Sequence, residues 1–363
     1  MCMDSSRFDH GGNIYAPRSE DAPPWLDFSA NINPLGLAAS VRKAIADNID
    51  AVIHYPDPMA RELKASLADH YGVPEESIIL GNGAAEIFYL FFAVKRFKRV
   101  LIPAPTFSEY ERAARAAHTD VNYFMLKATE NFALDAERFC AQARQQQADV
   151  VCLANPNNPT GNLIPPSQWQ IWVTGLQDTG QWIMLDESFL DFLPDAESYS
   201  LLRQAATQER LLVVRSLTKF FALPGLRLGF AVAPPSLVRE INAAKDVWNV
   251  NVLAQKAGVA ALADTAYQEE SRRLVAVEKE FLSVELAKLP GWKIFSPAAN
   301  FILADVSNTG QSGLSWAQAL RRQGILIRTF TDYPGLTENY IRLAVRSRAE
   351  NETLLAALDY IRA

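Results

Sequence analysis

The chain has 363 residues, of which 49% are hydrophobic and 21% are charged, a balance typical of a globular protein with a sizeable core. Its formal net charge of -6 argues against a nucleic-acid partner, because phosphate backbones attract an excess of Lys and Arg. The amino terminus has no basic segment ahead of an apolar core, no apolar run reaches the roughly 20 residues of a membrane helix, and the cysteines are scattered. We therefore expect a cytoplasmic protein without a membrane segment, a disulfide framework or a metal cluster.

Residues 1–40 are rich in Pro, Gly and Asn and contain no long periodic stretch, so we predict an extended arm there. Two motifs stand out in this arm. The sequence H-G-G-N covers residues 10–13, and D-F-S-A-N-I-N-P-L-G covers residues 27–36. Because Gly, Asn and Pro also serve ordinary turns, these residues alone leave open whether the motifs form turns or a binding site.

After the arm, apolar strands alternate with helical stretches, which predicts an open α/β sheet. The first such strand, over residues 78–80, runs into glycines and then into a helix. The amides in the first turn of a helix have no partner inside the helix and lie at its positive end, so Gly83, Ala84 and Ala85 are candidates for gripping a phosphate. A simple strand-to-helix turn is the alternative.

Two later strands also end in polar residues. The strand over residues 150–154 leads into N-P-N-N-P-T-G at residues 155–161, and the strand over residues 182–185 ends in Asp186 and Glu187. A carboxylate at such a place is costly to bury unless a cation neutralises it. Open α/β sheets bind their ligands at the carboxyl ends of the strands, so both loops predict a site there.

The segment over residues 211–232 places Lys219 between two apolar strands. A lysine in a cleft of this kind is partly desolvated, which lowers its pKa and allows the amine to react with an aldehyde. The hydroxyl groups of Ser216 and Thr218 and the cation of Arg227 flank the lysine and could together hold a phosphate dianion. A lysine beside a phosphate site indicates pyridoxal phosphate as the cofactor, whereas the alternative for a lysine in a loop is a solvated side chain.

Beyond residue 250 the alternation of strands and helices fades. One long helix is predicted from Val252 to about Lys288, followed by short strands over residues 301–303 and 325–327 and a closing helix over residues 350–362. We predict an arm at residues 1–40, a large domain at residues 41–250, and an interdomain helix with a smaller α+β carboxy-terminal domain at residues 251–363.

The sequence S-L-T-K-F-F-A-L-P-G-L-R-L-G-F at residues 216–230 resembles the lysine segment of fold type I pyridoxal phosphate enzymes. It is most similar to the aminotransferase branch that contains histidinol-phosphate aminotransferase and L-threonine O-3-phosphate decarboxylase. The resemblance spans residues 10–346. It implies the fold type I architecture, an α/β fold in which the large domain has a mostly parallel, doubly wound sheet and holds the cofactor. It also implies a homodimer whose subunits share their active sites.

The resemblance also implies a role for each cofactor-binding residue. Lys219 would hold the cofactor covalently, Asp186 would pair with the pyridinium nitrogen, and Asn158 would bind the phenolic oxygen. Phe107, in the loop after the strand over residues 100–104, would stack on the ring, and Tyr55, in a Y-P-D loop, would reach the cofactor phosphate of the other subunit. Ordinary packing remains the alternative for both aromatic residues. The predicted cofactor site comprises Tyr55, Gly83, Ala84, Ala85, Phe107, Asn158, Asp186, Ser216, Thr218, Lys219 and Arg227, and the residues predicted to be catalytic are Lys219, Asp186 and Asn158.

For the substrate, the resemblance implies that Arg342 pairs with the α-carboxylate and that Arg328 binds the charged end of a phosphorylated amino acid. A solvated side chain is the alternative for Arg328. The opening H-G-G-N is more typical of the decarboxylase than of the aminotransferases, and Phe189 stands where the aminotransferases usually have Tyr. The predicted substrate site comprises His10, Asn33, Asn158, Arg328 and Arg342.

We therefore expect decarboxylation of L-threonine O-3-phosphate to (R)-1-aminopropan-2-yl phosphate and CO₂, for cobalamin biosynthesis. Three alternatives remain. The first is histidinol-phosphate aminotransferase, and the second is a decarboxylase of L-serine O-phosphate, a substrate that lacks one methyl group. The third is a catalytically silent relative, although the lysine, aspartate and arginine of the predicted site are all present.

Overall fold

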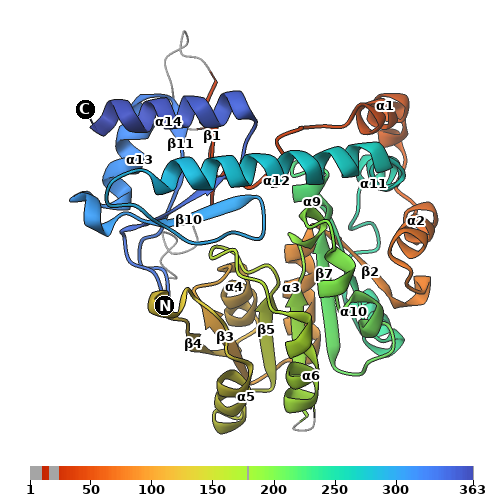
Figure 1. The fold of residues 1–363 in the computed structure, drawn as a ribbon. Coiled ribbons are helices and arrows are strands. Elements are labelled where there is room, and N and C mark those ends of the chain that lie inside the picture. Colours follow the sequence, from red (N-terminus) through yellow and green to blue (C-terminus); the bar gives the residue numbers. More distant parts are fainter. Residues whose placement is uncertain (1–9, 16–23, 178–179, 363) are drawn as a thin grey trace.

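The computed structural model describes residues 10–15, 24–177 and 180–362, so the start of the predicted arm lies outside the described residues (Figure 1). A seven-stranded sheet has the order β2-β8-β7-β6-β5-β3-β4. Its strands are β2 (Ile78–Asn82), β3 (Arg99–Ala104), β4 (Asp120–Met125), β5 (Val150–Ala154), β6 (Trp182–Asp186), β7 (Leu211–Ser216) and β8 (Leu228–Val232).

Parallel pairing joins β4, β3, β5, β6 and β7, whereas β8 runs antiparallel to both β7 and β2. The prediction of a mostly parallel sheet is confirmed. In the parallel part, Ala154 pairs with Asp186 and Asp186 pairs with Val214, so β5, β6 and β7 end at one edge of the sheet. The polar residues that follow these strands in the sequence are therefore brought together at that edge.

Helices cover both faces of this sheet because the strand residues alternate between two apolar clusters. In β6, Ile183 and Leu185 belong to one cluster and Met184 to the other. The first cluster includes residues of α2 (Arg61–Tyr71), α5 (Ala136–Gln145), α6 (Trp169–Gln177), α8 (Leu202–Ala205) and α11 (Val252–Ala263), and the second includes residues of α3 (Ala84–Lys95), α4 (Glu109–Ala116) and α10 (Pro235–Ala244). Burial on both faces explains why these strands are almost continuously apolar.

The predicted helix from Val252 to about Lys288 is in fact two helices, α11 and α12 (Thr265–Ala287). Asp264 separates them, and its side chain accepts a hydrogen bond from the Tyr267 N–H, which makes it the amino-terminal cap of α12. Periodicity alone missed this break because both helices are rich in Ala and Leu. Figure 1 shows α12 running from α11 to the carboxy-terminal part of the chain.

That part contains a four-stranded antiparallel sheet, β12-β13-β10-β9, and a parallel pair of β1 from the arm with β11. These strands are β1 (Leu26–Asp27), β9 (Lys293–Ile294), β10 (Phe301–Asp305), β11 (Ile325–Leu326), β12 (Arg328–Thr329) and β13 (Tyr340–Ala344). The remaining helices are α1 (Ala39–Asp47), α7 (Ala196–Tyr199), α9 (Leu217–Phe220), α13 (Gly313–Arg322) and α14 (Arg348–Arg362). A third apolar cluster joins this sheet to α12, α13, α14 and Phe28 of the arm. No helix within the described residues is both long and apolar enough to cross a membrane.

Candidate active site

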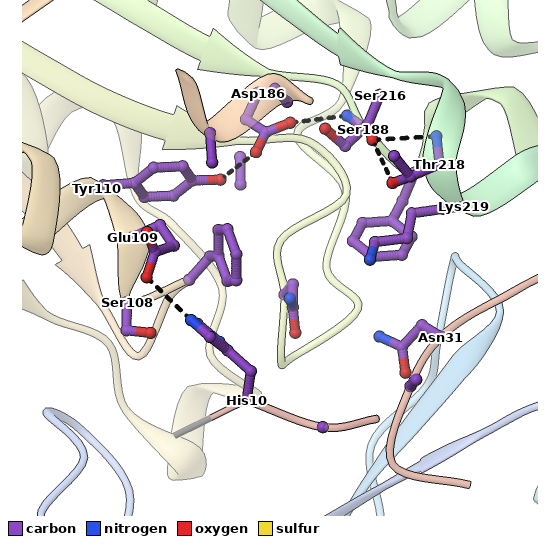
Figure 2. Close-up of a pocket in the computed structure, with 18 of the residues that line it drawn as sticks. His10, Asn31, Ser108, Glu109, Tyr110, Asp186, Ser188, Ser216, Thr218 and Lys219 are labelled. Atoms are coloured by element: carbon purple, nitrogen blue, oxygen red, sulfur yellow. Dashed lines mark hydrogen bonds and ion pairs between the residues drawn. The ribbon is translucent and has the colours of Figure 1, made fainter. Parts of the chain in front are cut away.

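A cavity of about 380 Å³ lies where β5, β6 and β7 end and where α3 and α4 begin (Figure 2). Most of the predicted site residues line it, although they come from the arm, the large sheet and the carboxy-terminal strands. Those that line it are His10, Ala84, Ala85, Phe107, Asn158, Asp186, Ser216, Thr218, Lys219, Arg227, Arg328 and Arg342. The structure does not bring Tyr55, Gly83 or Asn33 to the cavity wall.

Lys219 is half-buried on α9, directly after β7. Its burial and the positive charges of Arg342 and Arg227 lower the pKa of Lys219 to about 8, while the negative charge of Asp186 acts in the opposite direction. A fraction of this amine is therefore deprotonated near neutral pH and can attack an aldehyde.

Asp186 ends β6 and is buried in the cavity wall. Its Oδ2 accepts a hydrogen bond from the Tyr110 hydroxyl at 2.6 Å, and its Oδ1 accepts one from the Ser188 N–H at 2.8 Å (Figure 2). Burial raises the pKa of Asp186, and the two hydrogen bonds only partly oppose this effect. A ring cation beside the carboxylate would supply the missing counter-charge. The site therefore suits a protonated pyridine nitrogen.

Tyr110 was not predicted from the sequence. It lies on α4 and also lines the cavity, and its ring centre is 5.7 Å from that of Phe107. Its position in the first turn of α4, just after the loop that carries Phe107, was the signal available in the sequence.

Glu187, the alternative partner for the ring nitrogen, belongs to the opposite face of the sheet. Its Oε2 accepts a hydrogen bond from Arg215 Nη2 at 2.8 Å, and Arg215 Nη1 also donates to Asp191 at 2.5 Å. All three side chains are buried. Successive side chains of a strand point to opposite faces, so Asp186 reaches the cavity and its neighbour Glu187 does not.

The group of donors predicted to hold a phosphate lies together in the structure. Ala84 and Ala85 open α3, where the backbone N–H groups have no acceptor inside the helix. Ser216 and Thr218 place their hydroxyl oxygens 2.7 Å apart (Figure 2). Arg227 lines the same cavity and brings a fixed positive charge.

Gly83 differs from this prediction. Its N–H already donates to the Gly81 carbonyl at 2.8 Å, so it is not a donor to a phosphate. Gly83 has φ +82° and packs against Arg227, and a Cβ atom at this position would lie 2.3 Å from Arg227 Nη2. The glycine is needed to make room for the arginine.

Arg342 and Asn158 occupy the middle of the cavity. Arg342 donates one hydrogen bond to Asn158 Oδ1 at 2.5 Å and another to the Ser29 carbonyl at 2.7 Å. Burial and the neighbouring charge of Arg328 lower the pKa of Arg342 to about 9, so the guanidinium stays charged at neutral pH. The Nδ2 of Asn158 is the atom of this side chain that could donate to a cofactor oxygen.

Asn33, predicted to bind substrate, does not line the cavity in the structure. Asn33 Nδ2 donates to the Phe220 carbonyl and to Ser271 Oγ, both at 2.7 Å, and the Asn33 N–H donates to the Lys219 carbonyl at 3.1 Å. Asn33 therefore holds the backbone of the lysine segment by hydrogen bonds. Asn31 lines the cavity instead, and its buried Oδ1 has no hydrogen-bond partner among the described residues.

His10 of the arm lies at the opposite end of the cavity from Lys219 (Figure 2). Its Nε2 is 2.9 Å from Glu109 Oε1, and its ring centre is 5.6 Å from that of Phe107. The next residue, Gly11, packs so closely on the arm that a Cβ there would lie 2.0 Å from the Ser29 carbonyl oxygen. The glycines after His10 therefore allow the arm to fold against itself and to place the histidine over the cavity. Glu109, Arg112 and Tyr333, which also line the cavity, were not predicted from the sequence.

Tyr55 lies away from the cavity, with 77% of its surface exposed, and stacks on Trp248 with ring centres 4.2 Å apart. Phe189, at the position where the aminotransferases usually have Tyr, lines the cavity and packs edge-on against Phe301.

Comparisons with known proteins agree with this geometry. Residues 23–358 match the family described as aminotransferase class I and II. The chain is 35% identical to the threonine-phosphate decarboxylase of Salmonella typhimurium over 354 residues, 96% of this chain and 95% of that one. It is also 32% identical to the adenosylcobalamin biosynthesis bifunctional protein CobDQ of Leptospira interrogans, over 97% of this chain and 41% of that one.

Among solved structures, the histidinol-phosphate aminotransferase of Clostridium acetobutylicum superposes with a TM-score of 0.85 at 32% identity, covering 92% of this chain and 98% of that one. The resemblance inferred from the lysine segment is confirmed, and the chain belongs to the aminotransferase class I and II family.

Proposed function

We propose that the protein is a pyridoxal phosphate-dependent decarboxylase that converts L-threonine O-3-phosphate to (R)-1-aminopropan-2-yl phosphate and CO₂ for cobalamin biosynthesis. The observation that carries this proposal is the division of the cavity into two ends. Lys219, Asp186 and the phosphate donors form one end, and His10 of the arm closes the other (Figure 2). The similarity to named threonine-phosphate decarboxylases along almost the whole chain supports it.

The residues present fit pyridoxal phosphate. Lys219 would hold the cofactor's aldehyde carbon, Asp186 its ring nitrogen and Phe107 one face of its ring, while the amino terminus of α3, Ser216, Thr218 and Arg227 would hold its phosphate. When bound, the cofactor supplies an electron sink for the electron pair left on Cα.

The chain's own residues position the substrate and move the proton. Arg342 would pair with the α-carboxylate in the middle of the cavity, and Arg328 and His10 would hold the substrate phosphate at the far end. Two anchored ends fix the rotation about Cα, so remote binding energy selects the Cα–COO⁻ bond for cleavage. The Lys219 ammonium, with a pKa of about 8, can then donate a proton from Nζ to Cα.

Histidinol-phosphate aminotransferase is the second candidate, because the solved structure with that name shares the fold at a TM-score of 0.85 and 32% identity. The docked H-G-G-N motif favours the decarboxylase, since Gly11 is what allows His10 to reach the cavity. L-Serine O-phosphate, smaller by one methyl group, would lose only about 1 kcal/mol of binding.

We also propose a homodimer in which Tyr55 reaches the cofactor phosphate of the other subunit. Its exposure supports this role, and exposed apolar side chains of the same region, Ile49, Val52, Ile53 and Met59, suit an interface. The cytoplasmic location stays a prediction from the sequence.

Purified enzyme loaded with pyridoxal phosphate should release CO₂ from L-threonine O-3-phosphate without any keto acid. Unphosphorylated L-threonine should be a poor substrate, and L-serine O-phosphate measured in parallel ranks the two phosphorylated substrates. Efficient amino transfer from glutamate to imidazole acetol phosphate without CO₂ release would contradict the proposal and favour the aminotransferase. A yellow protein that turns over neither substrate would be a catalytically silent relative.

A further inference from the structure

At the end of the cavity closed by the arm, one buried carboxylate gathers three donors. Glu109 is only 8% exposed, and its Oε1 lies 2.9 Å from His10 Nε2 and 3.5 Å from Arg112 Nη1. Its Oε2 accepts a hydrogen bond from the Tyr89 hydroxyl at 3.3 Å. Burial alone would raise the pKa of Glu109, but the hydrogen bond from His10 and the charge of Arg112 bring it below its usual value. The carboxylate is therefore ionised at neutral pH and restrains all three donors.

Two of the three side chains that Glu109 restrains, those of His10 and Arg112, also line the cavity. The His10 side chain is 42% exposed and that of Arg112 is 46% exposed, and both line the cavity together with Arg328. Two guanidinium groups, those of Arg112 and Arg328, outweigh the single carboxylate. The side chains of Glu109, Arg112 and Arg328 together therefore carry a net positive charge.

Three separate elements supply these lining side chains. Arg112 comes from α4, which also carries Tyr110 of the cofactor site, while His10 comes from the arm and Arg328 from β12. The hydroxyl of Tyr333 donates a hydrogen bond to the Thr106 carbonyl. Burial raises the pKa of Tyr333 to about 12, and the positive charges of Arg328 and Arg342 oppose this rise. Tyr333 thus ties the strand of Arg328 to the segment that leads into α4.

We propose that Arg112 and Glu109 set the specificity for a substrate with an acidic group on its side chain. Arg112 contacts that group directly, and Glu109 is a positioning residue that orients Arg112 and His10 toward it. The inference rests on the proposed function and adds α4 to the elements that recognise the substrate's charged tail.

Arg112→Gln tests the direct contact, and α4 offers a matched control. Arg115 lies on the same helix, donates to the buried Glu111 at 2.7 Å and does not line the cavity. In Arg112→Gln the ratio of kcat/KM for L-threonine O-3-phosphate to that for L-threonine should fall roughly 10- to 100-fold, the range for one charge-assisted hydrogen bond, mainly through KM. Arg115→Gln should keep the wild-type ratio. An unchanged ratio in Arg112→Gln would overturn the direct contact.

Glu109→Gln separates positioning from simple repulsion. If the Glu109 carboxylate only repelled the phosphate of the substrate, its neutralisation would lower the KM for L-threonine O-3-phosphate. The positioning role instead predicts a higher KM for L-threonine O-3-phosphate. It also predicts a higher Kd of the holoenzyme for 1-aminopropan-2-yl phosphate, measured by calorimetry. Glu111→Gln should change neither value. A lower KM in Glu109→Gln would refute the positioning role.

Failure of the proposed function would look different. In that case the wild-type enzyme itself would release no CO₂ from L-threonine O-3-phosphate. The role of Arg112 would then be decided by the ratio of kcat/KM for L-histidinol phosphate to that for L-histidinol, compared between the wild type and Arg112→Gln.

Discussion

The Tyr110 hydroxyl and the Asp186 carboxylate, 76 positions apart in the chain, are joined by a buried hydrogen bond of 2.6 Å. This bond stabilises the ionised form of a carboxylate whose burial favours the protonated form. Tyr110→Phe should raise the pKa of Asp186 further and weaken the negative charge beside the cofactor ring nitrogen. We expect kcat/KM to fall about tenfold or more, since a hydrogen bond to a charged group contributes about 1.5–3 kcal/mol.

Tyr267→Phe is the matched control for that variant. Tyr267 donates to the Gly36 carbonyl at 2.7 Å and does not line the cavity, so its loss should cost stability and leave kcat/KM unchanged. If Tyr110→Phe had the same kcat/KM as the wild type at every pH, the hydrogen bond between Tyr110 and Asp186 would be irrelevant to the reaction.

Lys219 should make the cofactor-free protein less stable near neutral pH than at alkaline pH. Its folded-state pKa of about 8 is below the value of about 10.4 for an unfolded chain. Between these two pH values the unfolded state binds more protons than the folded state, so the free energy of unfolding contributed by Lys219 rises with pH. Lys219→Met should therefore be more stable than wild type in urea at pH 7, and this advantage should shrink by pH 10. Lys288→Met, which replaces an exposed lysine, is the control and should not gain stability over the wild type at pH 7. If the stability gained by Lys219→Met were the same at pH 7 and pH 10, the lowered pKa of Lys219 would be contradicted.

Gly83→Ala should weaken cofactor binding beyond the backbone cost of the substitution. The new Cβ would collide with Arg227 Nη2, displacing a cation of the phosphate site. Gly310→Ala is the control because Gly310 has a similar φ of +77° but no atom within 4 Å of a new Cβ. Both variants should lose about 1–2 kcal/mol of stability from the left-handed backbone. Only Gly83→Ala should raise the Kd for pyridoxal phosphate measured by fluorescence, and equal Kd values would disprove the clash argument.

Arg215 should be essential for stability. It is buried between Glu187 and Asp191, so Arg215→Met leaves two buried carboxylates without their cation and should cost about 3–5 kcal/mol in the free energy of unfolding. In a double-mutant cycle, Glu187→Gln combined with Arg215→Met should cost less than the sum of the single changes. Glu197→Gln, which breaks the exposed pair with Arg203, should cost less than about 1 kcal/mol. Strict additivity in the cycle would mean that the buried pair is not coupled.

Mixing two inactive variants tests whether Tyr55 acts across the dimer. A heterodimer of Tyr55→Ala and Lys219→Ala contains one site with both residues intact. Random exchange should therefore restore up to roughly a quarter of the wild-type activity, because half of the dimers are mixed and each has one good site of two. Proven subunit exchange without any recovery would rule out the shared site.

The sequence by itself determined the features that depend on near neighbours in the chain. The alternation of apolar strands and helices predicted an open α/β sheet, and residues that follow β5, β6 and β7 were expected at one edge of it. For the same reason Asp186 and Lys219 follow from the sequence pattern, since strand ends fix their positions, whereas Asn158 was chosen within the loop after β5 by the family resemblance. Local motifs also indicated the phosphate donors of α3 and the lysine segment.

The tertiary structure decided what depends on distant contacts. Asn31 and Asn33 are two positions apart, as two residues on one side of an extended strand would be, but a tight turn in which the Ile32 N–H donates to the Ala30 carbonyl changes the chain direction between them. Only the docked arm shows that Asn31 faces the cavity and Asn33 supports the lysine segment.

The same holds for Gly83, whose N–H is used within its own turn, and for Glu109, which meets His10 across 99 positions of the chain. Such contacts are set by how the arm and α4 pack around the cavity, and no local propensity encodes them.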